Sequence, residues 1–162
     1  MTNVVEIASI QRRFCAYLID VIILLIPTLL LTVLLQNFPL GLYLAYMCVS
    51  CSYFAYFTSA NNQATPGQQL IGIRTINIDN HKISIHLAFD RSISQYFLPL
   101  LNKIQVILIS LFEDFSDTFA ILQMLITLLT ICWYLVACFS KKKQTFHDML
   151  FNTVVVKVTH LS

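Results

Sequence analysis

Three long apolar runs constrain the fold of this chain more than any other feature of its sequence. They occupy residues 14–35, 40–60 and 118–139. Each is about as long as the roughly 20 helical residues that cross a hydrocarbon core of about 30 Å. Composition points the same way, because 57% of the 162 residues are hydrophobic and 11% are charged, whereas about a quarter of a soluble domain is charged. We therefore predict an all-α membrane protein, since helices satisfy their own backbone hydrogen bonds in lipid.

The first apolar run follows Gln11-Arg12-Arg13, which resembles the charged beginning of a signal peptide. The run is longer than the apolar part of a typical signal peptide, and no small-x-small cleavage site follows it. We therefore expect it to stay in the mature protein as the first span. Pro39, which is unsuited to a helix interior, separates it from the second run.

A further run, residues 94–112, has the length of a span but a different content. Pro99, Asn102 and Lys103 lie near its centre, and a lysine at mid-bilayer costs about 2.5 to 3.5 kcal/mol on insertion scales. Two interpretations stay open. The run is either a complete third span, which makes four in all, or an interfacial helix followed by a re-entrant segment.

The longest polar stretch, residues 61–93, is predicted to be a cytoplasmic loop with internal order. Isoleucines alternate with other residues on both sides of Asp79-Asn80-His81-Lys82, which predicts two short strands joined by a turn, a β-hairpin-like segment. These isoleucines are Ile71, Ile73, Ile76, Ile78, Ile83 and Ile85. After them, residues 87–94 are predicted to start an amphipathic helix along the membrane surface. Residues 140–162 are expected to form a cytoplasmic tail.

The basic residues fix an orientation. With four spans, nine of the ten Lys and Arg lie on one side, and the opposite loops have none. Since loops rich in Lys and Arg stay in the cytoplasm, both termini are predicted to be cytoplasmic. The nine residues are Arg12, Arg13, Arg74, Lys82, Arg91, Lys141, Lys142, Lys143 and Lys157.

Asp20 is an ionisable residue inside the first span. Seven residues at about 100° each bring it back almost to the helix face of Arg13, with the small Ala16 between them. Such residues usually face the bundle interior and are candidate functional sites. One interpretation is a structural anchor, protonated or paired with Arg13, Lys103 or a neighbouring helix; the other is a group in an ion or substrate path.

Beyond the last span, Lys141-Lys142-Lys143 is typical of a stop-transfer anchor with some attraction for anionic lipid. His147-Asp148 follows it and is either a proton-handling pair or a structural one. The pair has no evident third partner in the sequence, so catalysis is not predicted from it.

Other chemistries find little support in the sequence. The five cysteines lie in apolar runs, and Cys48 and Cys51 are placed mid-span, so packing is favoured over redox or metal chemistry. The sequence contains no metalloprotease, nucleophile-elbow or phosphate-loop motif. A net charge of +2 is too small to indicate nucleic-acid binding. We expect no enzyme, no cofactor and no metal site.

Three stretches resemble the signature stretches of the RDD membrane proteins, a family named for one arginine and two aspartates. They are residues 13–20, residues 65–74 from Thr-Pro-Gly onward, and residues 144–156 around Phe-His-Asp. The resemblance extends from about residue 11 to 156 and implies a single RDD-like transmembrane domain, 11–156. It implies that Arg13 is the family arginine and that Asp20 and Asp148 are the two aspartates.

The chain departs from the common family pattern at two positions. Gln68 stands where a basic residue often follows Thr-Pro-Gly, and Gln95 stands where a second arginine often follows the one that matches Arg91. Lipid or partner contacts of those basic residues are therefore not implied for this chain.

The resemblance implies transport of an ion or small solute, with sodium/proton exchange proposed for some members. Under this hypothesis Asp20 binds a proton or cation, Arg13 modulates it, Asp148 lies near the cytoplasmic mouth, and Lys103 is a further candidate. The expected location is a bacterial inner membrane, with lipid, a second copy or another membrane protein as partners. The alternative is a non-transporting scaffold or accessory subunit that docks through residues 61–93.

Overall fold

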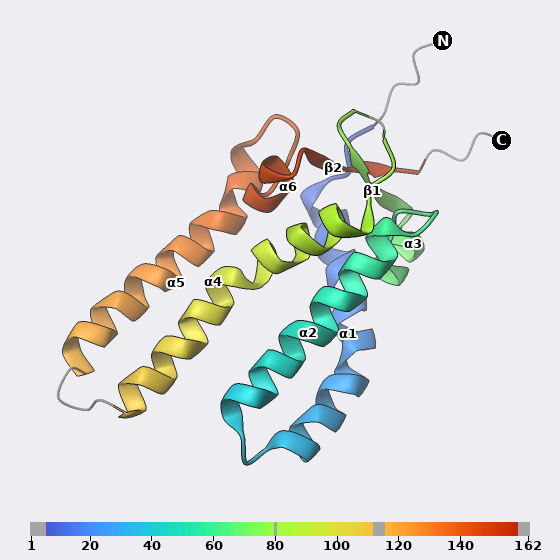
Figure 1. Ribbon diagram of the computed structural model, residues 1–162. Helices are drawn as coiled ribbons and strands as arrows, with labels where there is room; N and C mark the ends of the chain where they lie inside the picture. The colour runs from blue at the N-terminus through green and yellow to red at the C-terminus, as the bar shows by residue number, and fades with distance from the viewer. Residues whose placement is uncertain (1–5, 80, 112–115, 159–162) are drawn as a thin grey trace, which may run out of the picture.

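The computed structural model describes residues 6–79, 81–111 and 116–158. The predicted turn residue Asn80 and the polar break at 112–115 lie outside these residues. Four long helices extend from one end of the molecule, where the short elements and both termini gather (Figure 1). The elements in chain order are α1 (Ile10–Leu35), α2 (Pro39–Ser59), α3 (Pro66–Ile71), β1 (Ile73–Asn77), α4 (Ile85–Leu111), α5 (Ser116–Phe139), α6 (Phe146–Leu150) and β2 (Thr153–Lys157).

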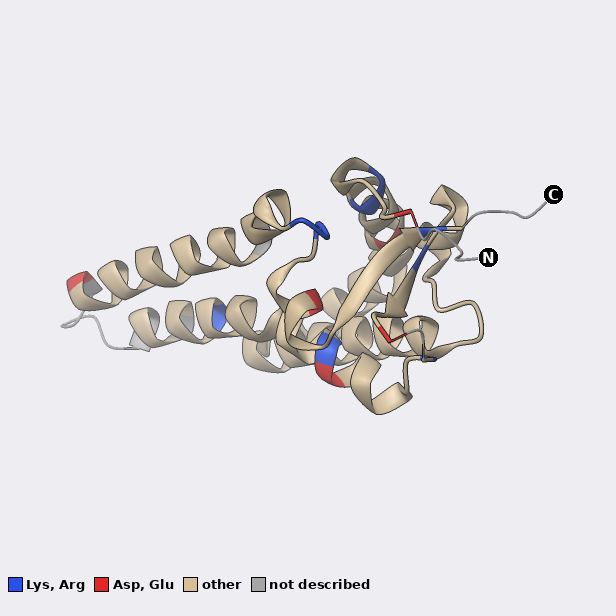
Figure 2. Cartoon of the chain, turned by 90° about the horizontal axis from the view of Figure 1, so that it is seen from above, with Lys and Arg blue, Asp and Glu red and all other residues tan. Residues whose placement is uncertain are grey.

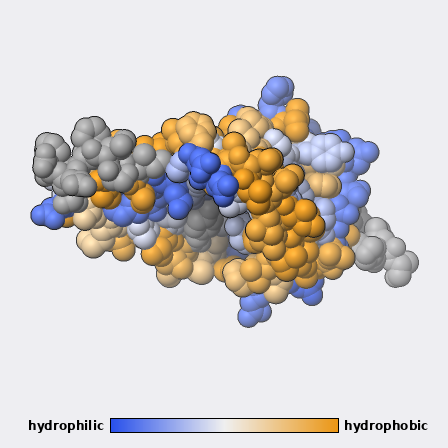
Figure 3. Space-filling model, turned by 90° about the horizontal axis from the view of Figure 1, so that it is seen from below, coloured by the Kyte–Doolittle hydropathy of each residue, from blue (hydrophilic) through white to orange (hydrophobic). Residues whose placement is uncertain are grey.

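Among the described residues, three helices are long and apolar enough to cross a membrane: α1, α2 and α5. They occupy the three apolar runs predicted as spans, with boundaries shifted by a few residues. Their outer surfaces are apolar, with Ile26 77% and Phe139 87% exposed. Seen from the end opposite the sheet, a broad patch of apolar side chains covers one half of the surface (Figure 3). Lipid is the solvent that suits such a surface.

Local signals explain where the helices begin. The Ser9 side chain accepts a hydrogen bond from the backbone N–H of Arg12 at 3.4 Å, so α1 starts four residues before the apolar run. Pro39 occupies the first turn of α2, where its missing N–H costs nothing.

The helix α4 differs from its prediction. It begins at Ile85 and continues through Pro99 to Leu111, so the predicted surface helix at 87–94 and the run 94–112 form one helix. No break for a re-entrant turn occurs within 85–111. Lys103 lies on this helix and is exposed. Because of such polar residues, α4 is not among the helices apolar enough to qualify as a span.

The β-hairpin predicted within residues 61–93 is wrong. The strand β1 pairs instead with β2 from the C-terminal segment, antiparallel, with Thr75 opposite Val155. After β1, the chain turns into α4, whose Leu87 N–H donates to the Ser84 hydroxyl at 3.2 Å. Ile83, predicted in the second strand, packs with alanines of α2 and α4. Residues 153–156 are four consecutive β-branched residues, whereas residues 83–85 contain two, so the C-terminal segment has the higher strand propensity.

This pairing makes the predicted loop and tail parts of one folded unit. The N-terminal segment joins them, since Ile7 forms a β-bridge to Val156. Under the sheet, Ala8 and Ala16 pack with Ile73 and Val155. The sheet therefore covers the first turns of α1, and residues 140–162 are not a free tail in their described part.

The long helices form a row in which α2 packs against α1 and α4, and α4 packs against α5. Charged residues gather at the end of this row that carries the sheet, and the rest of the helices is almost free of them (Figure 2). This distribution places a polar cap on an apolar set of helices.

Candidate functional site

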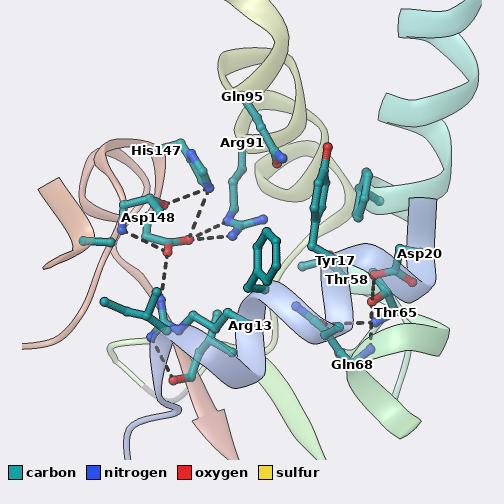
Figure 4. A pocket seen from close by; sticks show the side chains of 17 residues that line it. Arg13, Tyr17, Asp20, Thr58, Thr65, Gln68, Arg91, Gln95, His147 and Asp148 are labelled. Atoms are coloured by element: carbon teal, nitrogen blue, oxygen red, sulfur yellow. Dashed lines mark hydrogen bonds and ion pairs between the residues drawn. The ribbon is translucent and has the colours of Figure 1, made fainter. Parts of the chain in front are cut away.

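A cavity of about 530 Å³ lies beneath the polar cap, and its wall includes parts of α1, α2, α4, α5, α6 and β2. Two buried carboxylates, Asp20 and Asp148, contribute to the wall, and each is 2% exposed. Figure 4 shows them on different sides of the view, Asp148 among basic side chains and Asp20 beside Thr65. Each carboxylate has its own set of partners.

Asp148 accepts hydrogen bonds from two arginines. Arg91 donates from Nε at 3.1 Å and from Nη2 at 2.5 Å to Oδ1, and Arg13 donates from Nη1 to Oδ2 at 3.4 Å. The Thr153 hydroxyl donates to Oδ1 at 3.3 Å. Burial alone would raise the pKa of Asp148, but Arg91, His147 and Arg13 hold it well below its usual range. The carboxylate is therefore ionised at any physiological pH.

Local structure also orients Asp148. It lies in the first turn of α6, where its Oδ2 accepts the backbone N–H of Thr145 at 3.3 Å and completes a capping box. The same turn contains His147, whose Nε2 is 2.9 Å from the Thr145 hydroxyl. The short helix therefore presents both side chains toward the cavity.

Arg13 connects α1 to two C-terminal segments. Besides Asp148, it donates to the Lys143 carbonyl at 2.6 Å and to the Val155 carbonyl at 3.1 Å. The ion pair of Arg13 is with Asp148. An Arg13–Asp20 ion pair, one of the alternatives considered from the sequence, is therefore not formed. Both residues nonetheless line the same cavity, as their shared helix face predicts.

Asp20 instead joins α1 to α2 and α3. Its carboxylate accepts from the Tyr53 hydroxyl at 2.8 Å, the Thr65 hydroxyl at 2.6 Å and the Gly67 N–H at 2.9 Å. A neighbouring helix is thus among its partners, which was one of the sequence-based alternatives. Three donors satisfy the buried carboxylate.

The Thr-Pro-Gly stretch can approach α1 because Gly67 has no side chain. A Cβ there would lie 2.2 Å from the Ala16 carbonyl oxygen and 2.8 Å from Asp20 Oδ1. Thr65 caps α3 through a capping box with Gln68. Gly67 of α3 therefore packs directly against α1 at Ala16, the small residue between Arg13 and Asp20.

His147 lies 3.8 Å from Asp148 Oδ1, so the two form a pair in space as well as in sequence. Burial, followed by the repulsion of Arg91, lowers the pKa of His147 to about 4. The imidazole is therefore uncharged at neutral pH, which puts its titration outside the range predicted for a proton-handling histidine.

The sequence identified three of the cavity residues, Arg13, Asp20 and Asp148, and missed Arg91 as a member. The sequence did contain a signal for Arg91. It precedes a long apolar stretch, and an arginine there needs a counter-charge if its helix packs against others. Lys103, the fourth predicted residue, lies outside the cavity wall and is exposed. In the described part of the chain, no three His, Cys, Asp or Glu side chains are grouped to hold a metal ion.

Comparison with known proteins places this geometry in a family. A relative named "Uncharacterized protein MG243", from Mycoplasma genitalium, is 25% identical over 179 residues, which cover 98% of this chain and 79% of the relative. No solved structure matches the chain. The model of the RDD family matches residues 7–152, which include the arginine and both aspartates of the cavity. The chain therefore belongs to the RDD family of membrane proteins.

Proposed function

We propose that this protein transports an ion or small solute across a bacterial inner membrane and binds it in the cavity beneath the polar cap. The observation that carries the proposal is the position of this cavity, bordered by buried ionised side chains at one end of apolar helices. Ionisable groups at such places in membrane proteins usually mark the path of a substrate or ion. A volume of about 530 Å³ suits a small molecule.

The proposal includes four spans and a cytoplasmic polar cap. The pairing of β1 with β2 supports an even number of crossings between them, because a hydrogen-bonded sheet lies on one side of the bilayer. If α5 crosses, α4 must cross as well. The basic cluster at 141–143 beside the cap supports the cytoplasmic side.

In this proposal Asp20 is the group that exchanges a proton. A metal cation would have to displace the hydroxyls of Tyr53 and Thr65 and the N–H of Gly67. A proton would displace none of these groups, because a hydroxyl that donates to the carboxylate can rotate and accept a hydrogen bond from the protonated acid. Protonation would weaken the contacts of α1 with α2 and α3, which couples the ion to a movement of helices.

The test uses purified protein in vesicles with a lumenal pH reporter and an imposed sodium or proton gradient. Wild type should change the lumenal pH faster than empty vesicles do, and Asp20→Asn should lose most of this flux. Lys103→Gln, a change at an exposed residue of α4 outside the cavity, is the matched control and should keep it. Equal rates in wild-type and empty vesicles would refute proton-coupled transport; flux unchanged in Asp20→Asn would refute the role of Asp20.

The alternative is a scaffold or accessory subunit that acts through residues 61–93. One observation favours it, namely the outward Leu70 of α3, which is 74% exposed at the polar cap. A cross-linker attached at Leu70→Cys in native membranes would capture one specific protein if this segment docks. Capture of such a partner, together with no flux in vesicles, would favour the scaffold over the transporter.

A further inference from the structure

The two ends of the cavity differ in charge. At the end formed by α6, two arginines share one carboxylate, so Arg13, Arg91 and Asp148 together have a surplus of one positive charge. His147 does not change this sum, since burial lowers its pKa to about 4. The other acid, Asp20, already accepts three hydrogen bonds from groups outside this cluster.

The surplus charge is buried and incompletely satisfied. Arg91 is 8% exposed. The buried Nε of Arg13 has no hydrogen-bond acceptor among the described residues. Besides Asp148, Arg13 donates to the backbone carbonyls of Lys143 and Val155, which carry no net charge. A buried cation without a counter-charge is costly, so this end of the cavity favours an anion.

The remaining wall is largely apolar and aromatic. Tyr17 of α1 stacks on Phe54 of α2, with ring centroids 6.5 Å apart. Phe14, one turn before on α1, also lines the cavity and is 59% exposed, so the aromatic side reaches the outer surface of the helices. Figure 4 places the Arg91 guanidinium between the Asp148 carboxylate and the Tyr17 ring. A ligand in this cavity would meet cations at one side and rings at the other.

We propose that the cavity binds the carboxylate or phosphate group of an amphiphilic molecule, with the anion toward Arg91 and Arg13 and the apolar body against Phe14 and Tyr17. Guanidinium groups match both anions in geometry and charge. This inference rests on the proposed function and names the chemical class of its solute. The anion could be supplied by a membrane lipid or by a free small molecule.

The test measures binding to the protein in nanodiscs of zwitterionic phosphatidylcholine. The single tryptophan is a built-in reporter, because the Trp133 ring lies 4.0 Å from the Phe146 ring, one residue before His147. Dodecyl phosphate and dodecanoate are compared with dodecanol, which has the same apolar chain and no charge. The anions should bind at least about tenfold more tightly. Equal affinity of the alcohol would overturn the proposal.

Competition identifies the source of the anion. Displacement of dodecyl phosphate by inorganic phosphate supports a free anion as ligand. Resistance to inorganic phosphate, with displacement by phosphatidic acid in the nanodisc, supports a lipid headgroup. Either result requires the anion preference to have been established first.

Variants test the surplus charge itself. Arg91→Gln should remove the preference for the anion over the alcohol, while Arg91→Lys and the exposed control Lys103→Gln should keep it. The double change Arg91→Gln with Asp148→Asn leaves Arg13 as the surplus charge and should restore the preference. If Arg91→Gln does not fold, Arg13→Gln removes the same surplus charge and should abolish the preference in its place. A preference that survives Arg91→Gln would refute the site. If the protein shows flux in vesicles but no binding preference for the anion, the anion site is refuted and the transport proposal stands. If it shows the preference but no flux, the transport proposal is refuted and the anion site stands.

Discussion

Asp148 has more charged partners than any other described carboxylate, so the stability of the cap depends on it. Asp148→Asn leaves Arg91 and Arg13 buried without their counter-charge, and we expect a loss of about 3–5 kcal/mol in the free energy of unfolding. Thermal unfolding in detergent measures it. Asp117→Asn, at an exposed residue in the first turn of α5, is the control and should change little. A similar melting temperature for both variants would contradict the inferred importance of the cluster.

His147 makes stability depend on pH. Its pKa is about 4 in the folded chain against an ordinary value of 6.5, so the unfolded chain binds the extra proton first. Its contribution is therefore complete above pH 6.5 and falls as the pH drops toward 4, by about 3 kcal/mol over the window. His147→Gln should flatten the unfolding free energy across this range, whereas the exposed His86→Gln should leave the slope unchanged. Equal slopes in all three proteins would disprove the assignment.

At the scale of single elements, the docking of α3 on α1 depends on a close approach. Gly67→Ala places a Cβ 2.2 Å from the Ala16 carbonyl oxygen, so α3 must move and the Gly67 N–H bond to Asp20 must lengthen. We expect a loss of about 1–3 kcal/mol, as for other overpacked contacts, and faster hydrogen exchange at residues 65–71. Gly72→Ala, in open space but at φ 70°, should cost about 1 kcal/mol and leave exchange at 65–67 unaffected. Identical exchange in both variants would argue against the contact.

The long helices were predictable because length and hydropathy decide them within a local window, and α1 and α2 end within one residue of their predicted limits. The strand partner was not. Alternation in residues 71–78 indicates a strand, but it holds no information about a partner about 80 residues away. The cavity was predictable only in its local part. Helix periodicity placed Arg13 and Asp20 on one face of α1. Their partners, Asp148 for Arg13 and the Tyr53 hydroxyl for Asp20, depend on tertiary packing that no local pattern encodes.

For the whole molecule, the sheet is the main support for the proposed topology. Both β1 and the segment at Ile7 pair with β2, so the proposal puts the segments before α1, after α2 and after α5 on one side of the bilayer. A three-span arrangement of α1, α2 and α5 would put β2 on the side opposite β1 and break this sheet. In the proposed topology the crossing of α4 therefore follows from the β pairing, even though Lys103 opposes it energetically.

A topology map tests this directly. Single cysteines at Asn37, His81, Asp117 and the C-terminal Ser162 in a chain whose native cysteines are replaced by serine or alanine can be labelled from either side of intact cells. We expect Asn37 and Asp117 to react with an impermeant maleimide from outside, and His81 and Ser162 only after the membrane is opened. Labelling of Asp117 from inside, together with Ser162 from outside, would mean that α4 does not cross. That result would also separate β1 from β2, so a chain without the sheet is the useful comparison. The substitution Ile76→Pro supplies it, because the Ile76 N–H faces Val154 of β2, whereas the neighbouring Thr75 N–H donates to the Gln63 carbonyl.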